Sequence, residues 1–293
     1  MYEEYWGLRE KPFENTPDPR FFYQSQKHEE AFSRLVYTIR ERKGAALLSG
    51  EYGCGKTLLG RSLMEELDSD RYELAILSNP KLSPVQFLKE VVHQLGREGD
   101  SGDKVNLMHE LHGIFYSNFQ REKETVILID EAQAIPDEEV FEEIRLLLNF
   151  QLNDRFLLTL ILLGQPELRR KVDQIPQLSQ RIAIRYHLKE LSYPETQGYV
   201  KYRLKTAGAY YDMFEEDCYD AIFEYSKGVP RKINNLCDLC LFDGMGRRVV
   251  RVNKDVVKHV SSDLRGEEIP EPSGEMIQDF IPYSSTALQE GVR

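Results

Sequence analysis

Residues 50–57 read Gly-Glu-Tyr-Gly-Cys-Gly-Lys-Thr, which is the spacing G-x-x-x-x-G-K-[ST] of a loop that cradles phosphate groups. The glycines let the backbone wrap a phosphate with its amide hydrogens pointing inward, and the start of a following helix adds partial positive charge. In such a loop Lys56 reaches the β- and γ-phosphates of a nucleotide, and the Thr57 hydroxyl completes the ligand shell of Mg²⁺. The pattern therefore predicts binding of ATP and Mg²⁺; the alternative is a tight turn that binds nothing.

The residues on either side predict the elements that position this loop. Residues 45–49 are a short apolar run typical of a buried strand, and residues 58–67 carry leucines and methionine at helical spacing. A strand, a glycine-rich loop and a helix in this order are the context that phosphate binding requires. The predicted nucleotide contacts in this stretch are Gly50, Gly53, Cys54, Gly55, Lys56, Thr57 and Leu58.

Polar side chains follow two further apolar runs. Residues 125–129 are β-branched and end at Asp130 and Glu131, as expected of a strand buried on both faces that delivers acids at its carboxyl end. We predict that Asp130 holds Mg²⁺ and that Glu131 polarises the attacking water; the alternative is a pair of carboxylates capping a surface strand. If the strand at 156–163 is adjacent, Gln165 comes to lie beside this pair, where its amide binds the γ-phosphate or positions water.

Candidate contacts also lie outside these two motifs. Tyr23 and His28 precede the first strand, and they either form a wall of the adenine pocket or simply pack. Arg181 comes just before the last predicted strand, where it either reaches the nucleotide of a neighbouring subunit or forms a surface ion pair. Pro230 and Arg231 begin a helix; a cation is unfavourable there, so Arg231 suggests a phosphate partner.

The chain of 293 residues is longer than one core usually serves. We expect a proline-punctuated aromatic segment and a helix over 1–43, followed over 44–191 by an α/β domain with a parallel sheet flanked by helices. The β signal then stops, and the helical patterns predict a small all-helical lid domain over 192–265. Residues 266–293 are rich in Glu, Pro and Ser, which predicts a disordered acidic tail with 280–283 as a docking motif.

Composition limits the class of protein. The chain is 41% hydrophobic and 30% charged, it contains no apolar run long enough to cross a membrane, and its first residues are too acidic and aromatic for a signal peptide, so we expect a cytoplasmic protein. A net charge of −11 argues against a general nucleic-acid coat protein but leaves room for a local basic patch that binds DNA. Cys237 and Cys240 form a lone C-x-x-C within an apolar helical pattern and are interpreted as buried thiols, not metal ligands.

Together these motifs resemble the AAA+ ATPases of the ExeA/GspA (general secretion pathway protein A) type. The stretches that carry the resemblance are residues 13–23, 50–57, 130–133, 164–168, 178–182 and 228–234. The resemblance implies that Lys56 and Thr57 are Walker A residues, Asp130 and Glu131 the Walker B pair, Gln165 the first sensor, Arg181 an arginine finger acting in trans and Arg231 the second sensor on the lid.

The sequence also departs from the ExeA pattern. ExeA-type proteins continue into a transmembrane helix and a periplasmic peptidoglycan-binding region, and this sequence has neither, which argues against a direct role in assembling a secretin through the cell wall. The related transposition ATPases that resemble MuB, TniB and TnsC share the core, have no membrane span and bind DNA.

From the sequence we therefore expect an ATP-hydrolysing P-loop protein that forms a ring-like homo-oligomer and uses ATP to remodel or assemble an unidentified protein partner. The alternative is an ATP-dependent DNA-binding scaffold of the MuB/TniB/TnsC type. A third reading is a nucleotide-binding interaction module without turnover.

Overall fold

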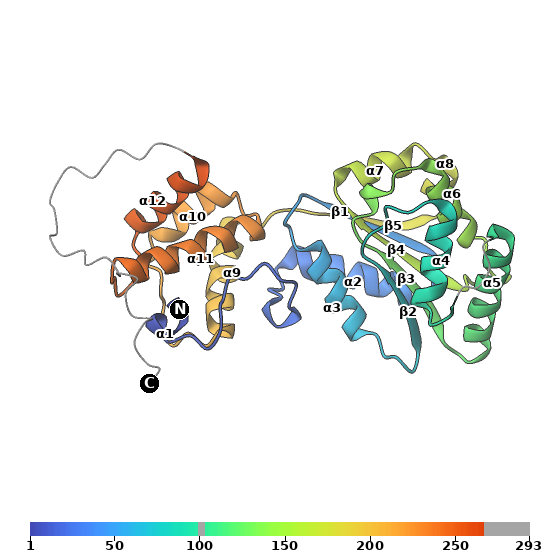
Figure 1. The fold of residues 1–293 in the computed structure, drawn as a ribbon, viewed down its shortest axis with the longest axis horizontal. Helices are drawn as coiled ribbons and strands as arrows, with labels where there is room; N and C mark the ends of the chain where they lie inside the picture. Colours follow the sequence, from blue (N-terminus) through green and yellow to red (C-terminus); the bar gives the residue numbers. More distant parts are fainter. Residues whose placement is uncertain (99–102, 267–293) are drawn as a thin grey trace, which may run out of the picture.

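The structure of the protein is a computed structural model that describes residues 1–98 and 103–266. It has two parts, a sheet covered by helices and a separate bundle of helices (Figure 1). The acidic tail predicted over 266–293, with its 280–283 motif, lies outside the described residues apart from Gly266.

A five-stranded parallel sheet forms the first part. Its strands are β1 (Ala45–Gly50), β2 (Tyr72–Leu77), β3 (Glu124–Ile129), β4 (Leu158–Gly164) and β5 (Ile182–Leu188), in the spatial order β2-β3-β4-β1-β5. β1, β3 and β4 are almost entirely buried, as their continuous apolar sequences predict for strands covered on both faces. Since all the strands are parallel, their carboxyl ends meet at one edge, where ligands of such sheets bind.

Two layers of helices cover the sheet. One face packs against α4 to α8 and the other against α2 and α3, since alternate residues of each strand belong to different apolar clusters. The helices of this part are α2 (Gln26–Arg40), α3 (Lys56–Glu66), α4 (Pro84–Gln94), α5 (Lys104–Gln120), α6 (Glu138–Leu147), α7 (Pro166–Asp173) and α8 (Pro176–Ser179), with a 3-10 turn, η2, at Ala132–Ala134. The predicted parallel sheet flanked by helices is confirmed.

The helical part has an apolar core of its own. It contains α9 (Tyr193–Thr206), α10 (Cys218–Ser226), α11 (Pro230–Gly246) and α12 (Lys254–Arg265), drawn in yellow to red in Figure 1. Cys237 and Cys240 are fully buried in this core, and burial raises the pKa of both thiols. Among the described helices, none is long and apolar enough to cross a membrane.

The amino-terminal segment joins the two parts. It contains α1 (Tyr2–Trp6) and the 3-10 turn η1 (Pro19–Phe21), and its rings lie in the apolar core of the helical part, where the Trp6 indole donates a hydrogen bond to Leu241 O at 2.9 Å. The chain then enters α2, which packs on the sheet. The residues before α2 are thus mostly bound to the helices of the second part, because the side chains of Trp6, Phe13 and Phe21 are buried in its apolar core.

Candidate nucleotide-binding site

The glycine-rich loop connects the carboxyl end of β1 to the first turn of α3. Gly53 and Gly55 have φ angles of +84° and +92°, a left-handed conformation that side chains with a Cβ rarely adopt. A Cβ on Gly53 would come within 2.8 Å of the Cβ of Arg231, so the helical part approaches the loop closely at this point. The loop therefore needs glycine both for its own conformation and for contact with the lid.

Lys56 holds its charge inside this loop. Its side chain is only 5% exposed, and the ammonium group donates hydrogen bonds to Gly50 O at 2.8 Å and Glu51 O at 2.9 Å. Burial lowers the pKa of Lys56 from its ordinary value, while the carboxylates of Glu131 and Asp130 act in the opposite direction. A partly desolvated cation bonded to carbonyl oxygens is suited to exchange them for phosphate oxygens.

The acidic pair lies directly beside the loop. The Thr57 hydroxyl donates to Asp130 Oδ2 at 2.6 Å, and Asp130 Oδ1 accepts the Glu131 amide at 2.8 Å. Glu131 itself has a φ of +50°, a strained conformation for a residue with a side chain. A hydroxyl and a carboxylate in contact, on the edge where the lysine lies, provide the hard oxygen donors that Mg²⁺ prefers, so these residues fit the ion.

Gln165 reaches the acidic pair because β3 and β4 are neighbours, as the sequence argument required. Its amide nitrogen lies 3.5 Å from Glu131 Oε2. The Gln133 side chain donates to the same carboxylate oxygen and accepts the Gln165 backbone amide at 3.0 Å. No role for Gln133 was predicted from the sequence, although its position two residues after Glu131 was a signal for this contact.

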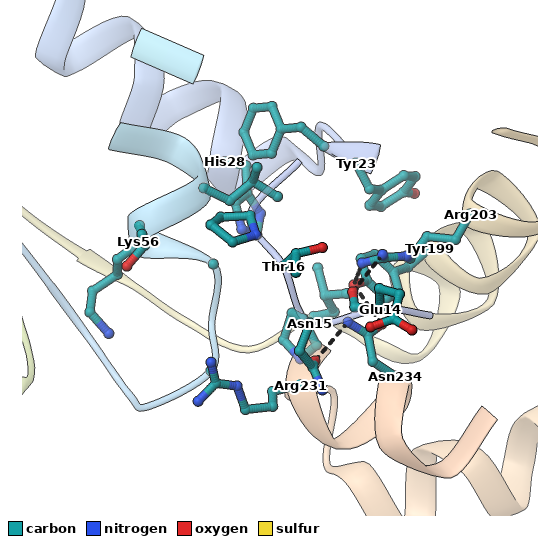
Figure 2. Close-up of a pocket in the computed structure, with 18 of the residues that line it drawn as sticks. Glu14, Asn15, Thr16, Tyr23, His28, Lys56, Tyr199, Arg203, Arg231 and Asn234 are labelled. Carbon is teal, nitrogen blue, oxygen red and sulfur yellow. Dashed lines mark hydrogen bonds between the residues drawn. The ribbon is translucent and has the colours of Figure 1, made fainter. Parts of the chain in front are cut away.

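A cavity opens between the sheet and the helical part, in front of this loop (Figure 2). Predicted contact residues that line it are Tyr23, His28, Gly53, Gly55, Lys56, Thr57, Leu58, Glu131, Pro230 and Arg231. Gly50 and Cys54 do not line the cavity. The Cys54 side chain is buried behind the loop, which raises its thiol pKa to about 11.

Arg231 links the lid helix to the loop. Its backbone amide lies 3.3 Å from Gly53 O, and its guanidinium lies over the Tyr52 ring, 4.5 Å from the centroid. Figure 2 shows the side chain running from the start of α11 toward the loop. The cation predicted at the amino end of this helix is therefore at the rim of the cavity.

Residues 39–172 match a family described as AAA domain. This chain carries an AAA domain. It is 35% identical over 275 residues to general secretion pathway protein A of Aeromonas hydrophila, an alignment that covers 91% of this chain and 50% of the relative. The chain thus spans about half the length of that curated relative, and the resemblance to the ExeA/GspA type is confirmed.

Solved structures show the same fold. A structure of the Aeropyrum pernix ORC1 protein in complex with DNA has a TM-score of 0.64 at 15% identity, over 88% of this chain and 69% of that one. The RuvB Holliday junction branch migration motor of Thermotoga maritima has a TM-score of 0.58 at 18% identity, over 83% and 70% of the two chains. At these identities the likeness concerns the fold alone, and it covers the AAA domain together with the helices that follow it.

A strap formed by residues 10–23 closes the cavity on the side opposite the phosphate-binding loop. Residues 14–17 of the strap line the cavity, and Asn15 accepts a hydrogen bond from the Asn234 amide of α11 at 3.1 Å. Asn234 in turn accepts the Tyr199 hydroxyl at 2.8 Å. Tyr23 is the only residue of the strap that was predicted from the sequence to contact the nucleotide, so the rest of this wall was not predicted.

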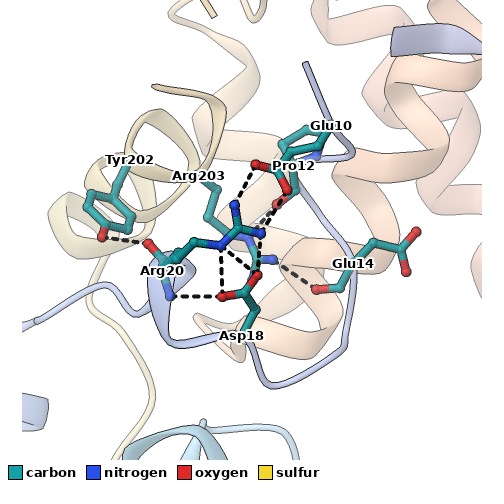
Figure 3. A network of polar contacts seen from close by, with 7 residues as sticks. All are labelled: Glu10, Pro12, Glu14, Asp18, Arg20, Tyr202 and Arg203. Carbon is teal, nitrogen blue, oxygen red and sulfur yellow. Dashed lines mark hydrogen bonds and ion pairs between the residues drawn. The ribbon is translucent and has the colours of Figure 1, made fainter. Parts of the chain in front are cut away.

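Arg203 of α9 binds the strap through its side chain (Figure 3). It is only 4% exposed, and its guanidinium donates to the carbonyl oxygens of Pro12 and Glu14 and, at 2.9 Å, to the Tyr199 hydroxyl. The same guanidinium lies 4.8 Å from the centroid of the Phe21 ring. An arginine in the buried stripe of a helical pattern was the sequence signal for this contact.

A second arginine holds the outer end of the strap. Arg20 pairs with Asp18 and Glu10 within the strap, and its carbonyl oxygen accepts the Tyr202 hydroxyl of α9 at 3.0 Å (Figure 3). These ion pairs are exposed and add little stability individually. Together with Arg203 they keep the strap on α9.

His28 connects the start of α2 to the back of the phosphate-binding loop. It is buried, its Nε2 lies 3.1 Å from Cys54 O, and its Nδ1 lies 2.7 Å from the Ser25 hydroxyl. Since a carbonyl only accepts, Nε2 carries the proton and Nδ1 accepts from Ser25. Burial lowers the pKa of His28, which favours this neutral form.

Arg181 lies at the other edge of the AAA domain, just before β5. Its guanidinium donates to Leu148 O at 2.7 Å and Asn149 Oδ1 at 2.6 Å. The residue is outside the cavity of its own chain, a position compatible with action on a neighbouring subunit as well as with a structural role. Its role in trans stays a prediction.

Proposed function

We propose that the chain binds Mg²⁺ and ATP in the cavity between the AAA domain and the helical lid, and hydrolyses the γ-phosphate. The observation that carries this proposal is the contact between the Thr57 hydroxyl and Asp130, with Glu131 next in the chain, beside the buried Lys56 ammonium. The cation of Lys56, the metal ligands Thr57 and Asp130, and the general base Glu131 would then lie close together at the carboxyl edge of the sheet.

The residues divide the work of phosphoryl transfer. Lys56 and the amides of the glycine-rich loop bind the phosphate oxygens, and Thr57 and Asp130 hold Mg²⁺, which offsets the negative charge on the phosphates. Glu131 accepts a proton from the attacking water. Gln133 and Gln165 bond to Glu131 or lie close to it, so they orient its carboxylate and bind the water or the γ-phosphate.

The base of the nucleotide is placed on the far side of the cavity. Tyr23 and the other strap residues line that end and offer ring surfaces and backbone polar groups to a planar base, whereas His28 lies behind the phosphate-binding loop. We propose adenine as the base because the chain resembles ATPases along most of its described length.

Measuring ATP turnover distinguishes an ATPase from a nucleotide-binding module that does not hydrolyse ATP. Phosphate release should be measured with Mg²⁺ and ATP for the wild type, Glu131→Gln and Lys56→Ala. The proposal predicts release by the wild type, ATP binding without release by Glu131→Gln, and neither by Lys56→Ala. Equal phosphate release by the wild type and Glu131→Gln would refute the assignment of the general base.

We further propose that the chain forms a homo-oligomer, ring-like in shape, in which Arg181 completes the site of the neighbouring subunit and ATP drives remodelling or assembly of a protein partner. The similarity to general secretion pathway protein A supports this. Arg181→Ala should bind ATP but hydrolyse it slowly. Mixing Arg181→Ala with Glu131→Gln should recover part of the activity, since mixed interfaces then contain one intact site; no recovery would make Arg181 a structural residue.

A DNA-binding scaffold of the transposition type is the second candidate. The fold neighbours include proteins whose structures contain DNA, which favours testing it. Binding of duplex DNA should be measured with and without a non-hydrolysable ATP analogue across a salt series. Strong binding that requires the nucleotide and falls steeply with salt would support the scaffold over the protein remodeller.

A further inference from the structure

Tyr52 occupies the third position of the phosphate-binding loop, and neither the motif nor the proposed chemistry gives its side chain a role. It is 59% exposed, so it does not serve the apolar core. Its ring carries the Arg231 guanidinium at 4.5 Å from the centroid, and its hydroxyl accepts a hydrogen bond from Arg231 Nη1. The tyrosine therefore makes the side-chain contact between loop and lid at the rim of the cavity.

Arg231 needs such a partner because of its place in α11. It follows Pro230 in the first turn, where the helix end carries partial positive charge and disfavours a second positive group. The face of an aromatic ring attracts a guanidinium, and the Arg231 guanidinium lies over the Tyr52 ring. Among residues 1–98 and 103–266, no side chain or backbone oxygen accepts a hydrogen bond from Nε or Nη2 of Arg231, so the N–H groups of these two nitrogens remain for a ligand.

We propose that Tyr52 is a positioning residue for Arg231: it holds the guanidinium at the rim of the phosphate-binding loop so that its remaining N–H groups bind the triphosphate. This inference rests on the proposed function. The ring restricts a long side chain before ATP arrives, so less conformational entropy is lost when the lid arginine meets the phosphates. Arg231 and Tyr52 then act as one unit, although they belong to different parts of the molecule.

The test is a double-mutant cycle on ATP affinity, measured by calorimetric titration of the full chain with Mg²⁺ and ATP. The proteins are the wild type, Tyr52→Leu, Arg231→Ala and the combination of the two. Tyr52→Leu is expected to weaken ATP binding about two- to fivefold, the range for a ring and a cation at an exposed site. In the Arg231→Ala background the same change is expected to have no further effect, since the group that Tyr52 positions is gone.

Two further variants separate positioning from a general effect on the loop. Tyr52→Phe keeps the ring and should retain most of the wild-type affinity, whereas Arg231→Lys, which cannot stack as a plane, should lose its dependence on Tyr52. Tyr210→Leu is the matched control, since Tyr210 is an exposed tyrosine of the helical part away from the loop, and it should bind ATP as the wild type does.

The outcomes are distinguishable. Equal weakening by Tyr52→Leu in both backgrounds, no weakening in either, or tighter binding would overturn the positioning role while leaving ATP binding in place. A wild type that binds no ATP would overturn the proposed function and this inference with it. Thermal unfolding of each variant shows whether it has folded, so a binding defect cannot be confused with an unfolded protein.

Discussion

The two walls of the cavity are built in different ways. The phosphate side comes from two short stretches, 50–57 and 130–131, that follow β1 and β3 of one sheet, with β4 between these two strands. The opposite side joins the strap to α9 and α11, and its central hydrogen bond links Arg203 to Pro12, 191 positions earlier in the chain. The phosphate side is thus built from short loops held by the sheet. The opposite wall is built from contacts between segments that are far apart in the sequence. Substitutions on the two sides should consequently fail differently.

The largest effect is expected from Glu131→Gln on the phosphate side. Loss of the general base should reduce the rate of phosphate release about 100- to 10,000-fold. ATP affinity should change little, because the amide occupies the same volume. The rate is measured by coupled phosphate detection under saturating Mg²⁺ and ATP, with Glu138→Gln, an exposed first-turn glutamate of α6, as the control that should retain the wild-type rate.

Lys56→Ala should be next in size and should act on binding. Removing the buried ammonium deprives the phosphates of their closest cation, so ATP affinity should fall by at least about 100-fold. Calorimetric titration measures it. Lys81→Ala, which removes an exposed lysine in a loop, should leave the affinity unchanged; an unchanged affinity in Lys56→Ala would instead show that the loop does not hold the phosphates.

Arg203→Ala tests the opposite wall, where stability and binding should change together. Its removal leaves two backbone carbonyls and the Tyr199 hydroxyl without their donor, which should lower the free energy of unfolding by about 2–3 kcal/mol. Denaturant unfolding measures the loss. Lys205→Ala on the exposed side of α9 should change it by less than about 0.5 kcal/mol. Phosphate release at saturating ATP should persist in Arg203→Ala, unlike Glu131→Gln.

The smallest predicted effect concerns pH and His28. Its folded pKa is lowered by burial from the ordinary 6.5, so the unfolded chain takes up the proton first as the pH falls. The stability that His28 contributes as a neutral group is therefore complete above about pH 6.5 and is lost as the pH drops below it. Glu195 and Lys27 are the nearby charged groups, and they act on this pKa in opposite directions.

Unfolding free energies of the wild type and His28→Gln between pH 5 and pH 8 measure this contribution. The variant should depend less steeply on pH below 6.5 than the wild type. His109→Gln, at an exposed position of α5, should keep the wild-type slope. Parallel curves for the wild type and His28→Gln would contradict a buried neutral histidine behind the loop.

The difference between the walls also explains what sequence could predict. The strands and the glycine-rich loop were predictable because a buried parallel strand needs a continuous apolar run, and because the left-handed φ angles of Gly53 and Gly55 require glycine. The contact of Gln165 with the acidic pair followed from the adjacency of β3 and β4, which the alternation of strands and helices favours.

The strap could not be predicted in the same way. Arg203 donates to main-chain carbonyls, and any residue type at Pro12 or Glu14 provides one, so the partners leave no mark in the sequence. The pairing of Asn15 with Asn234 likewise depends on a fold that brings residues 219 positions apart together. The contact of Tyr52 with Arg231 belongs to the same class, because its partners come from the loop and the lid.

A crystal structure of the chain with Mg²⁺ and a non-hydrolysable ATP analogue tests the central claim most directly. The account predicts triphosphate density enclosed by residues 53–57, with the metal between Thr57 and Asp130 and the base against Tyr23 and the strap. Nucleotide density elsewhere, or a metal bound away from Asp130, would contradict it.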